Sequence, residues 1–358
     1  MIKESDFMNS SAHLSEDGKD LVIIDQRALP GKFQELHLRN LEAIVRAIAT
    51  LAVRGAPAIG IAAAYGFYIR ALENFPLFQK EGMESFFTRM KKESQALRRV
   101  RPTAVNLSWA LHRMEKKMEE GKTLSGNELL DFLRDQAMAI HREDMEMCLK
   151  ISEYGLSLLK DEDGLITHCN AGPLATSKYG TALGPILLGK ERGLHFHVFA
   201  DETRPLLQGA RLTTYELDKA GVDVRLICDS MASLVMKKGW VQACLVGCDR
   251  IAANGDFANK IGTSVLAILA HYYGIPFYTL GPASTVDLSC PSGDFIPIEE
   301  RDPDEIKKMW YKEPMAPEGV RAYNPSFDVT DHSLVTAIIT DKGILRPPFE
   351  EKLRALFI

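Results

Sequence analysis

A change of rhythm at Gly164 constrains the fold of this 358-residue chain more than any other feature of its sequence. From that point short apolar runs alternate with helical segments of roughly a dozen residues, which is typical of a parallel sheet with crossover helices. The pattern predicts a doubly wound sheet of Rossmann type in the C-terminal part. The predicted strands are Leu165–His168, His195–Ala200, Val224–Cys228, Ala243–Gly247, Pro276–Leu280 and Leu334–Ile339.

The residues before this sheet mostly show the helical spacing of apolar side chains. Two short runs, Leu21–Ile24 and Phe33–Leu38, precede the helices and predict a small hairpin. Helices are expected from Asn40 onward and over residues 58–72, 83–97, 105–120 and 126 to about 159. We therefore predict an α/β protein of two domains. A smaller, mostly helical domain with a small sheet takes residues 1–145, and a Rossmann-like domain takes residues 146–358.

Composition and charge disfavour several classes of function. The net charge is −5 and no basic block stands out, so broad attraction to nucleic acid or membranes is disfavoured, although a local cationic pocket for a phosphate is compatible. The first ten residues are charged and predict no secretory signal, and the longest apolar stretch, Ala58–Ile69, is too short to span a bilayer. The six irregularly spaced cysteines are expected to be reduced thiols. Together these features predict a cytoplasmic protein.

Polar or ionisable residues follow five successive strands of the predicted sheet. Ligands of such sheets bind beyond the carboxyl ends of the strands, so these positions are candidate site residues. Cys169 lies on a sharp turn before Gly172, where a thiol is accessible. Asp201, Asp229 and Asp249 end three further runs, and each alone could equally be a helix cap. The five segments are His168–Gly172, Asp201–Pro205, Cys228–Ser230, Gly247–Arg250 and Gly281–Thr285.

Three segments place a cation beside backbone that a phosphate could approach. Lys260 follows Asn259 and precedes a helix start at residues 262–264, where free N–H groups would face the same point, although a surface lysine is an equal alternative. Arg54 precedes Gly55-Ala56, where no side chain blocks the approach. Arg101 repeats this arrangement before Pro102-Thr103, and a capped turn explains either arginine segment equally well.

Other segments resemble nucleotide-, metal- or cofactor-binding motifs only in part. Gly184–Glu191 nearly matches a nucleotide-binding P-loop, but Glu191 replaces the Ser or Thr that would hold magnesium, and the segment is expected to be helical. His195 and His197 share a face of a predicted strand, yet no second pair stands at zinc spacing. No metal site is therefore expected. No G-x-G-x-x-G follows the first strand, so a nicotinamide or flavin cofactor is not expected either.

Several long segments resemble the motifs of one known family. Over about residues 20 to 345 the chain is similar to the methylthioribose-1-phosphate isomerases of methionine salvage. Their superfamily also contains ribose-1,5-bisphosphate isomerases and the regulatory subunits of a translation-initiation guanine-nucleotide exchange factor. The matching segments are VRGAPAIGIAAAYG, RPTAVNLSWAL, HCNAGPLATSKYGTALGPI, DETRPLLQGARLTTYEL, ICDSMASLVM and CDRIAANGDFANKIGTSVLAILA.

The resemblance implies an aldose–ketose isomerase that converts 5-methylthioribose 1-phosphate to 5-methylthioribulose 1-phosphate, works as a homodimer and needs no cofactor. It implies that Asp249 donates a proton and that Cys169 assists the transition state. Substrate contacts are implied for Arg54, Gly55, Ala56, Arg101, Gln208, Asn259 and Lys260.

The chemistry of such a reaction suits these residues. The C1 oxygen of the sugar is capped by phosphate, so the ring opens only if its oxygen receives a proton, which a carboxylic acid kept neutral in an apolar site can donate. Hydrogen then moves from C2 to C1, either through a base such as the Cys169 thiolate or as a hydride. Two alternatives remain: an isomerase of 5-deoxyribose 1-phosphate or ribose 1,5-bisphosphate, and a non-catalytic regulatory subunit on the same fold.

Overall fold

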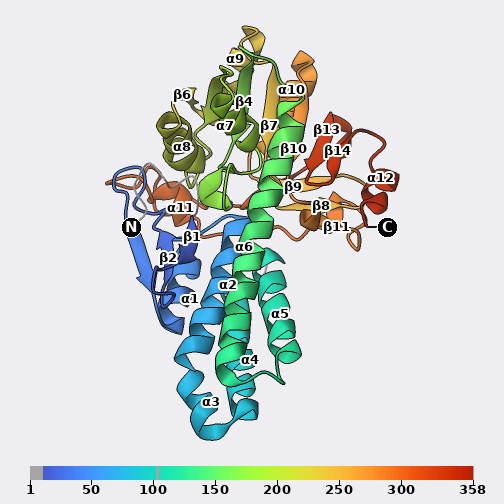
Figure 1. The fold of residues 1–358 in the computed structure, drawn as a ribbon. Helices are drawn as coiled ribbons and strands as arrows, with labels where there is room; N and C mark the ends of the chain where they lie inside the picture. Colours follow the sequence, from blue (N-terminus) through green and yellow to red (C-terminus); the bar gives the residue numbers. More distant parts are fainter. Residues whose placement is uncertain (1–10, 102–104, 358) are drawn as a thin grey trace. The chain divides into compact units, whose positions relative to one another are not determined.

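The computed structural model describes residues 11–101 and 105–357, in two compact units (Figure 1). Unit 1 comprises Met1–Met147 and Pro173–Gly180, and unit 2 comprises Cys148–Gly172 and Thr181–Ile358. The charged first ten residues and the segment Pro102–Ala104, with its candidate Thr103, lie outside the described residues. Within the described ranges, no helix combines the length and the apolar character needed to cross a membrane.

Unit 1 contains a three-stranded antiparallel sheet in the order β1-β2-β3. Strands β2 (Leu21–Ile24) and β3 (Glu35–Leu38) form the predicted hairpin, which is confirmed, and all four residues of the central strand β2 are buried. Strand β1 (Ala12–Leu14) was not predicted, because three residues are too few to show an alternating pattern.

The helices of unit 1 pack around α2 (Ala56–Glu73), which is buried continuously from Ala58 to Ala71. Small side chains allow this packing, since a Cβ added at Gly60 would lie 3.1 Å from the carbonyl oxygen of Asn106 in α5. The helix expected from Asn40 onward is present, and the Asn40 side chain caps it by accepting from the backbone N–H of Ala43. The other helices are α1 (Leu41–Ala49), α3 (Phe75–Glu81), α4 (Met83–Val100), α5 (Val105–Glu120) and α6 (Gly126–Leu156), which continues into unit 2.

The segment Pro173–Gly180 is bound to unit 1 by hydrogen bonds from distant parts of the chain. Ser11 Oγ donates to the carbonyl oxygen of Thr176 (2.6 Å), and Gln26 Nε2 donates to that of Leu174 (2.7 Å). Ser177 Oγ donates to the Asp144 carboxylate. Unit 1 is therefore assembled from two separate stretches of sequence.

Unit 2 is built on a seven-stranded sheet in the order β14-β13-β10-β7-β4-β5-β6, in which β14 alone is antiparallel to its neighbour. The predicted Rossmann-type sheet is thus confirmed. The strands are β4 (Gly164–His168), β5 (His197–Asp201), β6 (Asp223–Ile227), β7 (Ala243–Val246), β10 (Phe277–Leu280), β13 (Ala337–Thr340) and β14 (Gly343–Leu345). The helices between them are α7 (Gly184–Glu191), α8 (Thr214–Lys219), α9 (Ala232–Lys237) and α10 (Thr263–Tyr273).

The strand order places a topological switch point between β4 and β7. From β4 the chain proceeds outward through β5 and β6 on one side, and then returns to build β7, β10 and β13 on the other. His168 at the end of β4 is in register with Val246 at the end of β7, so the two following turns start at the same level. Ligands of open α/β sheets bind in the crevice that such a switch point opens.

A second, four-stranded sheet in unit 2 was not predicted. Its order is β11-β8-β9-β12, formed by β8 (Arg250–Ala252), β9 (Phe257–Lys260), β11 (Val286–Asp287) and β12 (Phe327–Thr330). These strands are short and carry charged or polar residues, so their pattern resembles a loop. Asn259 and Lys260 consequently end a strand. The helix start predicted at residues 262–264 is confirmed, because α10 (Thr263–Tyr273) begins there. Two short helices, α11 (Asp304–Lys307) and α12 (Glu350–Ala355), complete the unit.

Candidate active site

The turn after β4 holds Cys169 in a conformation that few side chains adopt. Its φ is 65°, and its backbone N–H donates to Thr203 Oγ1 (2.9 Å) while its carbonyl oxygen accepts from Thr213 Oγ1 (2.6 Å). Only 9% of the residue is exposed. Because positive φ is costly outside glycine, these two hydrogen bonds help to hold the backbone of Cys169 in this conformation at the end of the strand.

The following residues attach this turn to α8. The Asn170 side chain donates to Glu216 and to Thr213 Oγ1 (3.2 Å). A Cβ added at Gly172 would lie 2.4 Å from Glu216 Oε2, so only glycine fits there. The sharp turn predicted between Cys169 and Gly172 is therefore present, and its backbone is held closely.

Asp249 lies on the neighbouring turn, after β7. Its backbone N–H donates to the carbonyl oxygen of Ala258 (2.9 Å). A Cβ added at Gly247 would lie 2.9 Å from the Cβ of Ala171, so the turns that follow β7 and β4 are in close contact. The predicted pair Cys169 and Asp249 thus flanks the switch point. Asp249 is exposed in this structure, and not enclosed as a protonated carboxyl group requires.

Gln208 belongs to the loop after β5 and is buried, with 4% of its surface exposed. Its Oε1 atom is buried and has no hydrogen-bond partner among residues 11–101 and 105–357. An unsatisfied buried carbonyl costs about 1–3 kcal/mol, which a hydroxyl group of a bound ligand would relieve.

Asn259 and Lys260 end β9, close to the same turns. Asn259 Nδ2 donates to Thr263 Oγ1 (3.0 Å), and the Lys260 ammonium lies 4.4 Å from the centre of the Phe327 ring. The prediction that free N–H groups of α10 would face a phosphate here is wrong. The Asp328 carboxylate already accepts from the backbone N–H groups of Gly262 (2.8 Å) and Ser264 (3.2 Å).

The other four predicted substrate residues belong to unit 1. Gly55 precedes α2 with φ at 100°, and an added Cβ would lie 2.4 Å from the carbonyl oxygen of Ala175, so glycine is required there. Arg54 and Ala56 flank it and are half-buried. Arg101 follows the last residue of α4 and is also half-buried.

Sequence reasoning missed a buried contact between a histidine and an aspartate beside Cys169. His168 Nδ1 lies 3.0 Å from Asp201 Oδ2, and only 1% and 3% of the two side chains are exposed. Burial disfavours the charged imidazole, but the hydrogen bond and charge of Asp201, together with the charge of Asp229 and the hydrogen bond to Ile261, outweigh burial and raise the pKa of His168. Burial also raises the pKa of Asp201 to about 6. Neither Asp201 nor Asp229 is a helix cap. The Asp201 carboxylate contacts His168, and the Asp229 carboxylate accepts from the backbone N–H groups of residues 203 and 204, both at 2.8 Å.

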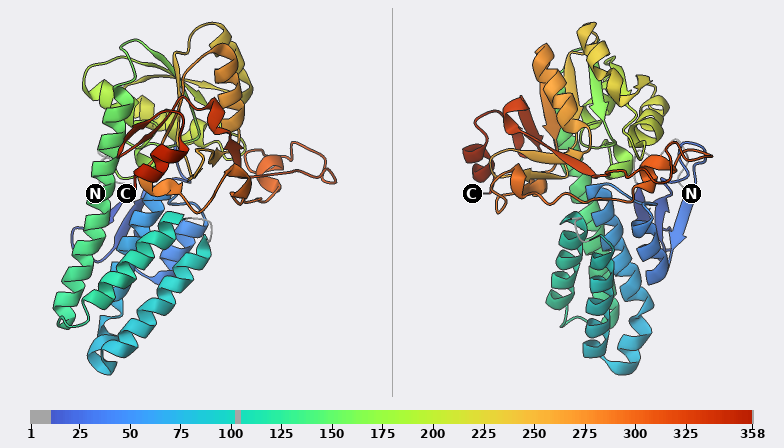
Figure 2. Two further views of the ribbon diagram at one scale, coloured as in Figure 1. Left: turned by 90° about the vertical axis from the view of Figure 1, so that its right-hand side faces the viewer. Right: turned by 180° about the vertical axis from the view of Figure 1, so that it is seen from behind.

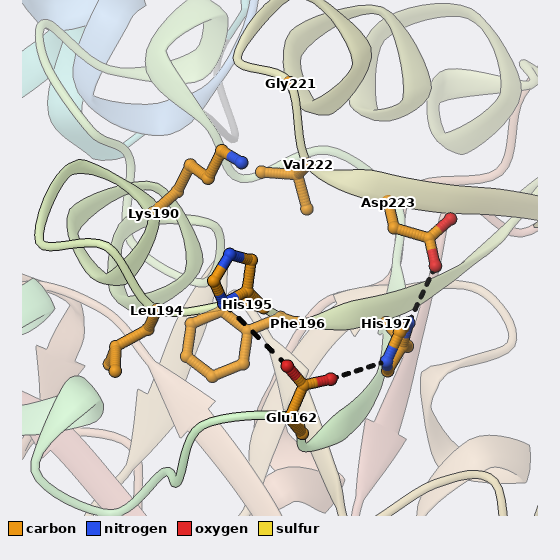
Figure 3. Close-up of a pocket in the computed structure, with 9 residues that line it drawn as sticks. All are labelled: Glu162, Lys190, Leu194, His195, Phe196, His197, Gly221, Val222 and Asp223. Carbon is orange, nitrogen blue, oxygen red and sulfur yellow. Dashed lines mark hydrogen bonds and ion pairs between the residues drawn. The ribbon is translucent and has the colours of Figure 1, made fainter.

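A cavity of about 380 Å³ lies at the opposite, amino ends of β5 and β6 (Figure 3). In it His197 is held between Asp223 (2.7 Å) and Glu162 (3.1 Å), which raise its pKa. His195 precedes β5, so the prediction that His195 and His197 share a face of one strand is wrong. The P-loop-like segment 184–191 is helix α7, as predicted.

These observations define a Rossmann-like enzyme fold with polar turns gathered at the switch point, and comparison with known proteins agrees with it. Residues 52–347 match the Initiation factor 2 subunit family, and the chain belongs to this family.

Within the family, the sequence is 56% identical to methylthioribose-1-phosphate isomerase of Symbiobacterium thermophilum, over 96% of this chain and 95% of the relative. It is 55% identical to 5-deoxyribose 1-phosphate isomerase of Petrotoga mobilis, over 96% and 98%. The structure is similar to 5-methylthioribose 1-phosphate isomerase from Pyrococcus horikoshii OT3, with a TM-score of 0.90, 41% identity and coverage of 100% and 98%. It is also similar to translation initiation factor eIF-2B, subunit delta, from A. fulgidus, with a TM-score of 0.85, 39% identity and coverage of 96% and 98%.

Proposed function

We propose that this chain is an aldose–ketose isomerase that converts 5-methylthioribose 1-phosphate to 5-methylthioribulose 1-phosphate in methionine salvage. The observation that carries the proposal is the placement of Cys169 and Asp249 on adjoining turns at the switch point of the sheet. The 56% identity to a methylthioribose-1-phosphate isomerase over nearly the whole chain supports the same substrate.

In the proposed reaction Asp249 donates its carboxyl proton to the ring oxygen as the bond from that oxygen to C1 breaks. Cys169 then assists the transfer of hydrogen from C2 to C1. In one route its thiolate takes the C2 proton to give an enol, and the thiol then returns a proton to C1 while the C2 hydroxyl gives its proton to the Asp249 carboxylate. In the other route hydride moves directly from C2 to C1 while the C2 hydroxyl gives its proton to the same carboxylate. Both routes leave a ketone at C2 and the phosphate on C1. Because Asp249 is exposed without ligand, the bound sugar must itself exclude water from the carboxyl group.

Other residues bind and orient the sugar, whereas Asp249 and Cys169 carry out the proton and hydrogen transfers. We propose that the domain of residues 146–358 is catalytic and that Gln208 Oε1, buried without a partner among the described residues, accepts from a sugar hydroxyl. Asn259 and Lys260 contact the substrate from β9. The domain of residues 1–145 contributes Arg54, Gly55, Ala56 and Arg101. No cofactor or metal is required, so turnover should survive dialysis against EDTA.

We further propose a cytoplasmic homodimer. Helices α9 and α10 pack side by side (Figure 2). Their exposed large apolar side chains are Leu234, Val265, Ile268 and Tyr272. Surfaces of this kind mark association sites. Sedimentation equilibrium should report a dimer that Val265→Glu with Ile268→Glu dissociates. Met138→Glu, which changes an exposed apolar residue of α6, should leave the dimer intact.

The test of the activity is a coupled assay with three sugars: 5-methylthioribose 1-phosphate, 5-deoxyribose 1-phosphate and ribose 1,5-bisphosphate. We expect the highest kcat/KM with the first. Asp249→Asn and Cys169→Ser should each lower kcat by about 10²–10⁴-fold, the usual contribution of a positioned acid or base. Undiminished turnover in both variants would overturn the assigned roles, and a wild-type protein inactive on all three sugars would favour the regulatory-subunit alternative.

A second substrate is favoured by one observation, the 55% identity to a 5-deoxyribose 1-phosphate isomerase. The two sugars differ at C5, so an equal kcat/KM for both would make this chain an isomerase of 5-deoxypentose 1-phosphates in general. Running the reaction in deuterated water separates the two routes: label at C1 of the product supports proton transfer, and unlabelled product supports hydride transfer.

A further inference from the structure

His168 is the last residue of β4, and its ring joins two other segments of the site. Its Nε2 atom lies 2.8 Å from the carbonyl oxygen of Ile261, which only accepts, so Nε2 carries a proton. Its Nδ1 atom faces the Asp201 carboxylate at 3.0 Å. The ring therefore links the turn that carries Cys169 both to the end of β5 and to the residue that follows Lys260.

The surroundings of the ring are strongly acidic. Besides Asp201, the Asp229 carboxylate lies 4.0 Å from Nδ1, and Asp328 also interacts electrostatically with the ring. Asp229 and Asp328 each accept from two backbone N–H groups, those of residues 203 and 204 and those of residues 262 and 264. Three carboxylates thus lie around one imidazole, and two of them, Asp229 and Asp328, also hold neighbouring turns in place.

His168 Nε2 carries one proton, and the burial of Asp201 determines whether a second proton lies between His168 Nδ1 and the Asp201 carboxylate. Its Oδ1 atom has no hydrogen-bond partner within the described ranges, so its contact with His168 is the interaction that can balance its charge. An ionised carboxylate facing the lone pair of a neutral Nδ1 would be buried and uncompensated, which is strongly unfavourable. The pair is stable only when a proton lies between Nδ1 and Oδ2. The nearby carboxylates of Asp229 and Asp328 favour this proton on the ring, which is then an imidazolium ion.

Gly262 gives independent evidence that the ring is held in one place. Its φ is 102°, and an added Cβ would lie 2.8 Å from His168 Cε1 and 2.9 Å from Nε2. The backbone approaches the imidazole as closely as glycine allows, so the turn between β9 and α10 is packed directly on the ring.

We propose that His168 is a positioning residue which, as an imidazolium ion, locks the Cys169 turn to the Asn259–Lys260 segment. The inference rests on the proposed isomerase function, because it assigns those two segments to one substrate. His168 itself touches no substrate in this account. Its loss leaves the thiol and the ammonium group present but imprecisely placed, which lowers rate and affinity together.

The activity test compares His168→Gln with a matched control. His197→Gln also removes an imidazole held between carboxylates, but at the other end of the same sheet (Figure 3). We expect His168→Gln to lower kcat/KM about 10–100-fold, with KM rising as well as kcat falling, and His197→Gln to stay within about twofold of wild type. Asp201→Asn should cause a similar loss, and the double variant His168→Gln, Asp201→Asn should lose no more than either alone, because the two residues act as one unit.

The protonation state is tested on the wild-type protein, independently of turnover. In a spectrum of ¹⁵N-labelled histidine rings, the signal missing from His168→Gln identifies His168 among the nine histidines. We expect both of its nitrogens to be protonated at pH 7.5, where ordinary histidines are mostly neutral. A neutral ring, or wild-type kcat/KM in His168→Gln, overturns the inference even if the enzyme is active. Failure of the proposed function is distinct from this, since it appears as wild-type protein that turns over none of the sugars.

Discussion

Replacing Gly262 by Ala tests how tightly the site is packed. The new methyl group would lie 2.8 Å from His168 Cε1, well inside van der Waals contact. The ring has no free direction in which to retreat, because both of its nitrogens are hydrogen-bonded and 1% of its side chain is exposed. Moving it breaks the bond to the carbonyl oxygen of Ile261, and moving the turn breaks the bonds to Asp328.

The expected cost has two parts. A φ of 102° is strained for alanine and costs about 1–3 kcal/mol. Losing one buried hydrogen bond of the imidazole adds about 1–3 kcal/mol, for a total of about 2–6 kcal/mol. The control is Gly274→Ala at the other end of α10, where φ is 69° and nothing lies within 4 Å of an added Cβ. Only the conformational cost remains there, about 1–2 kcal/mol.

Urea denaturation followed by circular dichroism measures the free energy of unfolding of both variants, and kcat/KM is determined on the same samples. Gly262→Ala should be less stable than Gly274→Ala by about 1–3 kcal/mol, the hydrogen-bond part of the cost. It should also be the variant that loses activity. Equal destabilisation in the two variants, with equal activity, would refute the argument that the imidazole is locked against this glycine.

Two further predictions concern other buried polar groups. Glu93→Gln should cost about 3–5 kcal/mol, because it removes the buried carboxylate that pairs with the buried Arg70 and leaves the arginine with the exposed Glu73. Glu73→Gln removes that exposed carboxylate and should cost less than about 1 kcal/mol. Burial opposes ionisation of Glu93, but its arginine partners hold its pKa below 4.5. The contribution of Glu93 to the free energy of unfolding is therefore complete above pH 4.5 and is lost as the pH falls through the lower pKa of the folded state. Chemical denaturation at a series of acidic pH values should show a smaller loss of stability in Glu93→Gln than in the wild type. Thr203→Ala removes the acceptor of the Cys169 N–H and should lower both stability, by about 1–3 kcal/mol, and kcat, while Thr203→Ser restores both.

The large sheet was predictable because parallel strands that are buried on both faces appear in the sequence as short, continuous apolar runs. Every residue of β4, β7, β10 and β13 is buried. Sequence reasoning failed on β8 and β9, where three or four residues with Arg250 and Lys260 among them give no alternating signal. The small sheet is held together by pairing with β12, about 70 residues later, and no local pattern reports such a partner.

The candidate site was predictable only where residues stand at strand ends. Cys169 and Asp249 were singled out because the topology of the sheet brings their turns together. The part played by His168 could not be read in the same way, since a histidine at the end of a strand becomes informative only once Asp201 and Ile261 are known to meet it. Asp328 is hidden for the same reason: it occupies the N–H groups of residues that precede it by more than 60 positions.

Pro173–Gly180 belongs to unit 1, although the residues on both sides of it, including Cys169, belong to unit 2. Only Asn170, Ala171 and Gly172 separate Cys169 from a stretch that is built into unit 1. No single cut can separate the two units, because removing residues 1–147 strips Leu174 and Thr176 of the donors Gln26 and Ser11. The turn that carries Cys169 is therefore joined covalently to unit 1 through three residues.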